Sequence, residues 1–258
     1  MTLEVTQLVK HFGGVKALDG VSFGVQPGEC VALIGPNGAG KSTCFACIAG
    51  QLAATGGGVV WAGQALAGRT PAQRLRLGVA RTFQVAQTFE ALTAAQNLQL
   101  LLAAPHGLRG WNVLGRSHAD ETLALLARVG LGAQAQQSAL TLPYGAKKRL
   151  ELALALAGLQ GAAPALLLLD EPAAGLAPEE RAELMTLVRA LAASGMAVLY
   201  TEHNMDAVFG VADRVLVLVD GLLVAQGSPQ EIAANELVRS RYLGQSVPQA
   251  FQTAGQHA

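Results

Sequence analysis

The sequence has little cysteine and no excess of charge of either sign. The first argues against a disulfide-rich protein, and the second against a nucleic-acid-binding one. Three cysteines in 258 residues, at positions 30, 44 and 47, are too few for a disulfide framework and fit a reducing compartment. Cys44 and Cys47 have the spacing of a metal or redox pair, but no second pair completes such a site, so we expect them to pack in a core. The formal net charge of +0 argues against nucleic acid as a partner, because nucleic-acid-binding modules usually have a basic face. The densest basic cluster, Lys147-Lys148-Arg149, is predicted to be a solvated helix start.

We also expect neither a secretory signal nor a membrane span in this sequence. Met1 to Lys10 alternates polar and apolar side chains, so we expect no secretory signal there. Leu152 to Leu169 is strongly apolar and reaches the lower length limit of a membrane span. However, Gly158 and Pro164 interrupt it and Asp170 follows directly, which favours a buried helix, a turn and a buried strand. We therefore expect no transmembrane helix.

The sequence does contain an alternation of strand and helix patterns, on the scale of one large α/β domain or one domain with a small insertion. Helical spacing dominates from Pro71 to Gly161 and returns at Pro178 to Ala193, and a hairpin is expected to turn at Asp220-Gly221. This pattern predicts an α/β core with a helical subdomain inserted near its middle. The expected strands cover 3–9, 21–25, 30–34, 59–62, 165–169, 196–201 and 215–226, with a break at the glycines 56–58.

A phosphate-binding pattern, G-x-x-x-x-G-K-[ST], lies between a buried strand and a stretch at Thr43 to Ala49 that we interpret as an amphipathic helix. Phosphates need converging backbone N–H groups at a helix N-terminus, and glycines let the backbone come close. Lys41 can reach the β- and γ-phosphates, and Ser42 can offer its hydroxyl to Mg²⁺. A glycine-rich turn without a ligand is the alternative, but the strand and helix on either side favour nucleotide binding. The expected ligands are Gly35, Pro36, Asn37, Gly38, Ala39, Gly40, Lys41, Ser42 and Thr43.

A second polar site follows the apolar strand that ends in Asp170-Glu171. Ligands of open α/β sheets bind beyond the carboxyl ends of the strands, so Asp170 is expected near the phosphate loop, where it could hold Mg²⁺. Glu171 could orient or deprotonate an attacking water. A pair of surface acids is the alternative, and it is weakened by the phosphate loop nearby.

With these motifs in order, the chain resembles the ABC ATPase family. Arg81-Thr82-Phe83-Gln84 resembles the family's Q-loop, which implies that Gln84 touches Mg²⁺ and water. Thr201-Glu202-His203 resembles the switch region, which places His203 near the γ-phosphate, and Phe12 stands where the family stacks an aromatic ring on adenine. Read singly, Gln84 could be an ordinary loop residue, His203 a structural histidine and Phe12 a core residue.

The resemblance extends from Leu3 to about Gly244 and implies the α/β fold of a P-loop NTPase. The expected architecture is an ABC-type nucleotide-binding domain with an antiparallel β subdomain and an inserted α-helical subdomain. The domain would span 1–244, with the insertion at about 85–160 and a C-terminal tail at 245–258. The implied cofactors are ATP and Mg²⁺, and the implied activity is ATP hydrolysis. The resemblance assigns catalysis to Glu171, His203 and Gln84, and the metal to Ser42, Gln84 and Asp170.

The signature that would contact the nucleotide of a facing subunit departs from the common Leu-Ser-Gly-Gly-Gln. It reads Leu142-Pro143-Tyr144-Gly145-Ala146, so Pro143 removes a hydroxyl and Ala146 an amide. A helix predicted at 146–157 still favours an anion at its N-terminus. This form, followed by Arg149-Leu150-Glu151, resembles the ATP-binding proteins of branched-chain amino acid importers. The expected contacts across the interface come from Leu142, Tyr144, Gly145 and Ala146.

The resemblance implies partners as well. A second ATP-binding subunit, identical or different, would face this one, and transmembrane permease subunits would dock on the helical insertion. An extracytoplasmic solute-binding protein would act indirectly, and the chain would lie peripherally on the cytoplasmic face of the inner membrane. Ala177 stands where an acid or asparagine is usual, which we interpret as a sign that the facing subunit is a different protein. The alternatives are import of amides or aromatic acids, lipid extraction or export, and a soluble role in translation or DNA repair. The soluble role is disfavoured because tandem cassettes and long coiled coils are absent.

Overall fold

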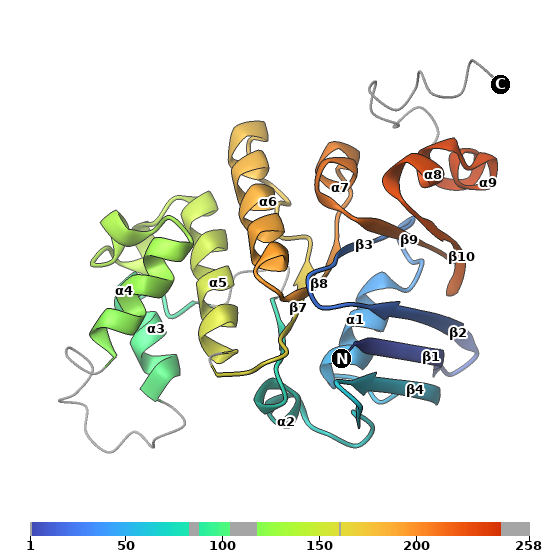
Figure 1. Ribbon diagram of the computed structural model, residues 1–258, viewed down its shortest axis with the longest axis horizontal. Coiled ribbons are helices and arrows are strands. Elements are labelled where there is room, and N and C mark those ends of the chain that lie inside the picture. The colour runs from blue at the N-terminus through green and yellow to red at the C-terminus, as the bar shows by residue number, and fades with distance from the viewer. Residues whose placement is uncertain (1, 83–87, 104–117, 160, 244–258) are drawn as a thin grey trace.

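The computed structural model describes residues 2–82, 88–103, 118–159 and 161–243. Two sheets and the helices around them form the molecule (Figure 1). The strands are β1 Leu3–Phe12, β2 Val15–Val25, β3 Cys30–Ile34, β4 Gly56–Trp61, β5 Gln64–Ala65, β6 Val79–Arg81, β7 Leu166–Asp170, β8 Ala197–Thr201, β9 Arg214–Val219 and β10 Leu222–Gly227. The α-helices are α1 Lys41–Ala49, α2 Pro71–Arg76, α3 Ala94–Ala103, α4 Ala119–Arg128, α5 Tyr144–Gly158, α6 Pro178–Ala193, α7 Met205–Val211, α8 Pro229–Ala234 and α9 Glu236–Val238. Single turns of 3₁₀ helix cover Gly132–Gln134 and Ala139–Thr141, and a π turn covers Arg239–Leu243.

The larger sheet has the strand order β10-β9-β3-β8-β7-β6. Its strands run parallel except β10, which forms an antiparallel hairpin with β9. The strands β3, β7 and β8 are buried along their whole length, as expected for strands covered on both faces. Because they are parallel, their carboxyl ends meet at one edge of the sheet. This edge therefore carries the segments that follow Ile34, Asp170 and Thr201.

The smaller sheet, ordered β2-β1-β4-β5, is antiparallel and covers the outer side of α1 (Figure 1). Helix α1 therefore lies between two sheets, and seven of its nine residues are buried. The sequence predicted an amphipathic stretch at Thr43 to Ala49, and this prediction is wrong. The reason is tertiary: the antiparallel sheet covers the face that an amphipathic helix would expose to water.

The three glycines 56–58 do not break the chain as predicted, because they form the first half of β4. Gly57 has φ +76°, and a Cβ there would lie 2.0 Å from the carbonyl oxygen of Gln7. The β1–β4 pairing shifts register between Thr6 and Val9, so the glycines allow a β-bulge in a continuous strand. The β1–β2 hairpin is also longer than predicted, since both strands continue to its tip at Phe12 and Val15.

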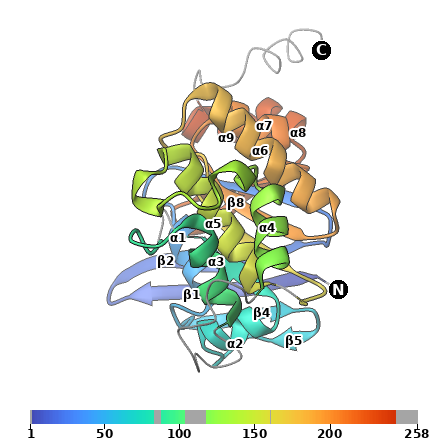
Figure 2. The same cartoon turned by 90° about the vertical axis from the view of Figure 1, so that its left-hand side faces the viewer.

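The helices α3, α4 and α5 pack together at one end of the larger sheet, and Figure 2 views them from that side. The basic cluster at the start of α5 is not the solvated helix start that the sequence predicted. Lys148 is buried and its Nζ lies 3.8 Å from the Oε2 of Glu151, which is also buried. Arg149 pairs with Glu183 of α6 at 2.5 Å. Packing of α5 against its neighbours buries Lys148 beside Glu151 of the same helix and gives Arg149 a carboxylate partner on α6.

Other local predictions are confirmed. Helix α6 has the predicted bounds, and strand β3 spans the predicted run. The β9–β10 hairpin turns at Asp220 (φ +48°) and Gly221 (φ +76°), the two positive φ angles of a type I′ turn. Within the described ranges, no helix combines the length and the apolarity that crossing a membrane requires.

The cysteines pack in the core, as predicted, and this makes their reactivity testable. Cys30, Cys44 and Cys47 are at most 3% exposed and form no disulfide. Burial raises the pKa of Cys30 to about 12 and raises that of Cys44 as well, so the reactive thiolate is scarce at pH 8. We expect iodoacetamide at pH 8 to label the native chain at least about 100-fold more slowly than the chain in denaturant, counted by mass spectrometry. Equal rates in the two states would contradict the buried placement.

Candidate nucleotide site at the carboxyl edge of the sheet

The phosphate loop connects β3 to α1 and is wedged between the two sheets. A Cβ at Gly35 would lie 1.9 Å from the Leu218 carbonyl oxygen in β9, and one at Gly40 would lie 2.3 Å from the Ala17 carbonyl oxygen in β2. Both positions therefore need glycine. Of the other loop residues, Asn37, Gly38 and Ser42 are exposed, Ala39 is buried, and Pro36 and Thr43 are partly buried.

Lys41, the first residue of α1, folds back over the loop. Its Nζ donates to the carbonyl oxygens of Gly35 at 2.6 Å and of Pro36 at 3.0 Å. Burial lowers the pKa of Lys41, and the nearby carboxylates of Glu171 and Asp170 oppose that shift. The phosphate loop and the two acids that follow β7 therefore share one electrostatic environment, as the sequence predicted.

Asp170 ends β7, and both of its carboxylate oxygens accept hydrogen bonds. Its Oδ1 accepts from the Thr201 hydroxyl at 2.9 Å, and its Oδ2 accepts from the Arg81 guanidinium at 2.6 Å. The Thr201 hydroxyl also accepts from the backbone N–H of Glu171 at 3.0 Å. One hydroxyl on β8 thus fixes both acidic residues at the end of the neighbouring strand.

Glu171 and His203 face each other across that edge. The Nε2 of His203 lies 2.9 Å from Oε1 of Glu171. Glu171 has φ +49°, a left-handed conformation that is uncommon for a residue with a side chain and is often found at functional sites. The His203 side chain is 44% exposed, so solvent and a ligand can reach its ring.

Sequence reasoning missed a buried carboxylate beside this pair. Glu202 is 3% exposed, and its two oxygens accept from the backbone N–H groups of Ala173 at 2.8 Å and His203 at 3.2 Å. Burial raises the pKa of Glu202, while the N–H donors stabilise its charged form. Glu202 therefore joins the turn after Glu171 to the turn that carries His203. The position of Glu202 within the Thr201-Glu202-His203 motif was the one sign in the sequence that could have indicated its role.

The signature residues begin helix α5, two residues earlier than predicted, with Pro143 as its N-cap. Tyr144 is 49% exposed. Its ring lies against Gly175 in the turn before α6, so close that a Cβ on Gly175 would lie 3.2 Å from the ring. Gly145 is buried and Ala146 partly buried in the same first turn. The structure does not support the predicted contact between Leu142 and the nucleotide of a facing subunit. The Leu142 side chain is 4% exposed and packs in the core.

Two further predicted residues differ in outcome. Phe12 is 47% exposed and Nζ of Lys10 lies 4.9 Å from its ring centre, so the core-packing alternative is wrong. Gln84 lies outside the described residues. Thr82, two positions before it, is buried and donates its N–H to the Leu168 carbonyl oxygen at 2.9 Å.

The oxygen donors at this edge decide whether Mg²⁺ fits the site. In the described part of the chain, no group of three or more His, Cys, Asp or Glu side chains is placed to hold a metal ion by itself. The exposed Ser42 hydroxyl and the Asp170 carboxylate are hard oxygen donors, which Mg²⁺ prefers. Two such groups suit a metal that keeps waters and shares phosphate oxygens with a nucleotide. The residues fit Mg²⁺ held together with a nucleotide.

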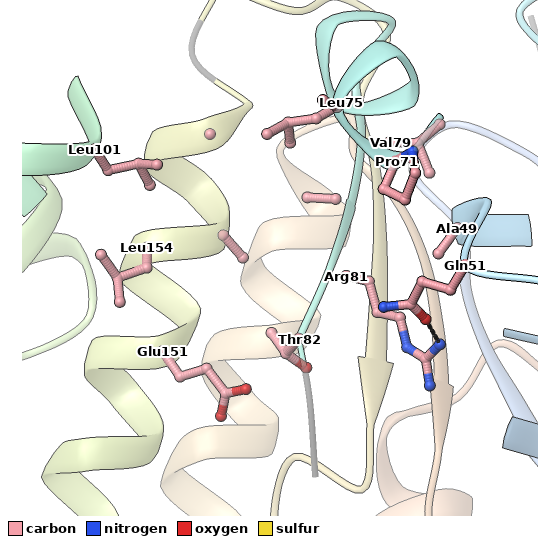
Figure 3. Close-up of a pocket in the computed structure, with 14 residues that line it drawn as sticks. Ala49, Gln51, Pro71, Leu75, Val79, Arg81, Thr82, Leu101, Glu151 and Leu154 are labelled. Carbon is pink, nitrogen blue, oxygen red and sulfur yellow. Dashed lines mark hydrogen bonds between the residues drawn. The ribbon is translucent and has the colours of Figure 1, made fainter. Parts of the chain in front are cut away.

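A cavity of about 350 Å³ lies beside this edge, between α2, α5 and β6 (Figure 3). Its wall is largely apolar, and Arg81, Thr82 and Glu151 provide polar groups. Figure 3 shows Leu101 and Leu154 on one side and Arg81 with Gln51 on the other. Arg81 therefore contacts Asp170 and also lines this cavity.

Comparison with known proteins agrees with this geometry. The family model described as ABC transporter matches residues 18–174. The chain is 38% identical over 254 residues to the high-affinity branched-chain amino acid transport ATP-binding protein LivG of Escherichia coli strain K12, covering 95% of this chain and 98% of LivG. It is 37% identical over 257 residues to BraF of Pseudomonas aeruginosa, which has the same description, covering 95% of this chain and 98% of BraF.

Solved structures agree as well. An ATP-binding cassette of an ABC transporter in its ADP conformation superposes with a TM-score of 0.82 at 29% identity, covering 95% of this chain and 99% of that one. A nucleotide-free cassette gives the same TM-score and identity, covering 95% of this chain and 100% of that one. The α/β architecture and the P-loop NTPase fold expected from the sequence are therefore confirmed. The chain belongs to the ABC transporter family, as one of its ATP-binding and ATP-hydrolysing cassettes.

Proposed function

We propose that this cassette energises the uptake of branched-chain or related amino acids through partner permease subunits. The observation that supports this most is the similarity to LivG and BraF over 95% of the chain, because it includes the segments outside the nucleotide site. The chain would then lie peripherally on the cytoplasmic face of the inner membrane. An extracytoplasmic solute-binding protein would act indirectly, by delivering the solute to the permease.

The proposed roles at the nucleotide site rest on the family resemblance, and the charges and the geometry support them. The backbone N–H groups of the phosphate loop and Lys41 bind the phosphates, and Phe12 stacks on adenine. Ser42 and Asp170, with Gln84, would hold Mg²⁺, which offsets the phosphate charge when bound. Glu171 acts as the general base toward the attacking water, and His203 positions Glu171 through their 2.9 Å contact.

A second ATP-binding subunit would complete the site by presenting its signature to the γ-phosphate. In this chain the exposed Tyr144 ring, with Gly145 and Ala146 at the N-terminus of α5, would serve the facing site. Ala177 has no side-chain hydrogen-bonding group, and Glu180 instead accepts its backbone N–H at 3.4 Å. We infer that the facing subunit is a different protein that supplies the missing polar group.

The cavity in Figure 3 suits the permease. Its apolar side chains, Leu75, Leu101 and Leu154, would receive the end of a cytoplasmic helix, and its volume is that of a few side chains rather than of a whole helix. Thr82 and Arg81 line it immediately before the segment that contains Gln84. Permease movement would therefore reach the nucleotide site by a short path.

Transport by the reconstituted complex tests this function. The cassette is placed in proteoliposomes with permease subunits, a second cassette and a solute-binding protein taken from the same genome. We expect ATP-dependent uptake of radiolabelled leucine, isoleucine or valine. The variant Leu154→Lys should reduce uptake at least about tenfold by charging the cavity wall, while ATP binding stays within about twofold. Leu140→Lys, at a 59% exposed position outside the cavity, is the matched control and should leave uptake unchanged.

Two outcomes would contradict the proposal. ATP-dependent uptake of amides or aromatic acids, or lipid extraction, without amino acid uptake would reject the assigned solute class. Equal uptake by Leu154→Lys and wild type would reject the cavity as the docking site and leave the solute class untouched.

A further inference from the structure

Arg81 forms a hydrogen-bonded ion pair with Asp170, although the motif that contains it pointed only to Gln84 as a functional residue. Its guanidinium lies 2.6 Å from the Oδ2 of Asp170, and the two side chains are 11% and 10% exposed. The same guanidinium donates to the side chain of Gln51 and lies 5.8 Å from the ring centre of Phe45. Contacts from β7, from α1 and from the turn after α1 therefore fix one cation on one carboxylate.

A cation at the carboxyl edge of the sheet offsets the negative charge of the carboxylates there. Asp170, Glu171 and Glu202 are close together there, and an unpaired carboxylate at this depth is costly. The ammonium of Lys41 is bonded to two loop carbonyl oxygens. Among the described side chains, Arg81 is the cation in hydrogen-bond contact with Asp170.

A divalent metal and the Arg81 guanidinium would compete for the carboxylate of Asp170. Both bind carboxylate oxygens, and Oδ2 of Asp170 already accepts from Arg81 while Oδ1 accepts from Thr201. Two cations near one carboxylate repel each other, and that repulsion is weakly screened at a buried site. The charge of Arg81 must therefore be overcome by any metal that uses Asp170.

We propose that Arg81 sets the divalent-cation affinity of the nucleotide site by holding Asp170 in competition with the metal. This proposal rests on the proposed function, in which Asp170 serves Mg²⁺. The ion pair stabilises the folded protein, because it gives a buried carboxylate a partner. The same ion pair lowers the affinity of Asp170 for Mg²⁺. Since Arg81 also lines the cavity of Figure 3, a change there that moves the guanidinium would alter the metal affinity.

The proposal predicts two effects of opposite sign for Arg81→Gln. The metal should bind more tightly, so the Mg²⁺ concentration that gives half-maximal binding of a fluorescent ADP analogue should fall about five- to tenfold. The protein without metal or nucleotide should melt roughly 5–10 °C lower, because Asp170 loses its partner. Arg81→Lys is the matched control; it retains the charge, and its half-maximal Mg²⁺ concentration should stay within about twofold of wild type. A purely structural role would lower the melting temperature without lowering the Mg²⁺ requirement.

Asp170→Asn separates the two levels of the argument. A raised Mg²⁺ requirement in Asp170→Asn, together with an unchanged or raised requirement in Arg81→Gln, would overturn the role of Arg81 and leave Asp170 as the metal ligand. An unchanged requirement in Asp170→Asn would overturn the metal assignment and the proposal that rests on it.

If Arg81→Gln folds only with ligand, it is purified with Mg²⁺ and the ADP analogue, and the EDTA concentration that releases half of the analogue is compared with wild type. Arg81→Gln should then need more EDTA than wild type, and an equal or smaller amount would overturn the proposal.

Discussion

Replacing Lys41 by alanine is expected to weaken ATP binding about 100- to 1000-fold, which corresponds to roughly 3–4 kcal/mol. Lys41 is 7% exposed, and its ammonium lies inside the phosphate loop, 2.6 and 3.0 Å from two loop carbonyl oxygens. An incoming triphosphate gives this ammonium charged oxygen partners, and charge-assisted hydrogen bonds are roughly twice as strong as neutral ones. Isothermal titration calorimetry with Mg-ATP measures the loss.

The control for Lys41 is Lys16→Ala, since Lys16 is an exposed lysine on β2 whose ion pair with Asp19 is on the surface. It should leave ATP affinity unchanged. Thermal melting of both variants shows whether a loss of binding arises from unfolding. An ATP affinity of folded Lys41→Ala within about threefold of wild type would remove Lys41 from the phosphate site, since threefold is less than 1 kcal/mol.

Replacing Glu171 by glutamine is expected to lower the rate of ATP hydrolysis about 100- to 10,000-fold and to leave ATP affinity nearly unchanged. The amide is close in shape to the carboxylate but cannot accept the proton of the attacking water. Glu171 is partly buried, its backbone is held by Thr201, and its carboxylate contacts His203 at 2.9 Å, so the loss should be chemical rather than structural. Phosphate release by the cassette together with its partner subunits is the measurement.

The same variant should accumulate the closed pair of subunits, because ATP that is bound but not hydrolysed keeps favouring that state. Size-exclusion chromatography with and without Mg-ATP reports it. Glu179→Gln, at an exposed position in the first turn of α6, is the matched control and should hydrolyse ATP at the wild-type rate. Undiminished phosphate release by Glu171→Gln would exclude Glu171 as the general base.

Much of the nucleotide site could be predicted because its signals are local. A phosphate loop needs glycines where the backbone passes close to its neighbours, and Gly35 and Gly40 show this requirement in the structure. The acids at 170 and 171 follow a run of apolar residues, and a parallel sheet places such strand ends along one edge. The type I′ turn at Asp220-Gly221 is a local property of two residues.

The contacts within the site were not readable in the same way. Arg81 and Asp170 are 89 positions apart, and Glu202 reaches the backbone of Ala173 from the neighbouring strand. Each of these residues stands in a recognisable motif, but the motif does not say which partner it meets. Strand order decides that, because β7 lies between β6 and β8 in the sheet.

The sequence by itself determined the α/β class, the phosphate loop, the acidic strand end and the family. Only the tertiary structure decided which surfaces are covered: seven of the nine residues of α1 are buried, Arg149 of α5 pairs with Glu183 of α6, and Leu142 is in the core. The physical reason is that periodicity and turn chemistry depend on neighbours along the chain. Burial and ion pairing depend instead on distant segments that the sheet order brings together.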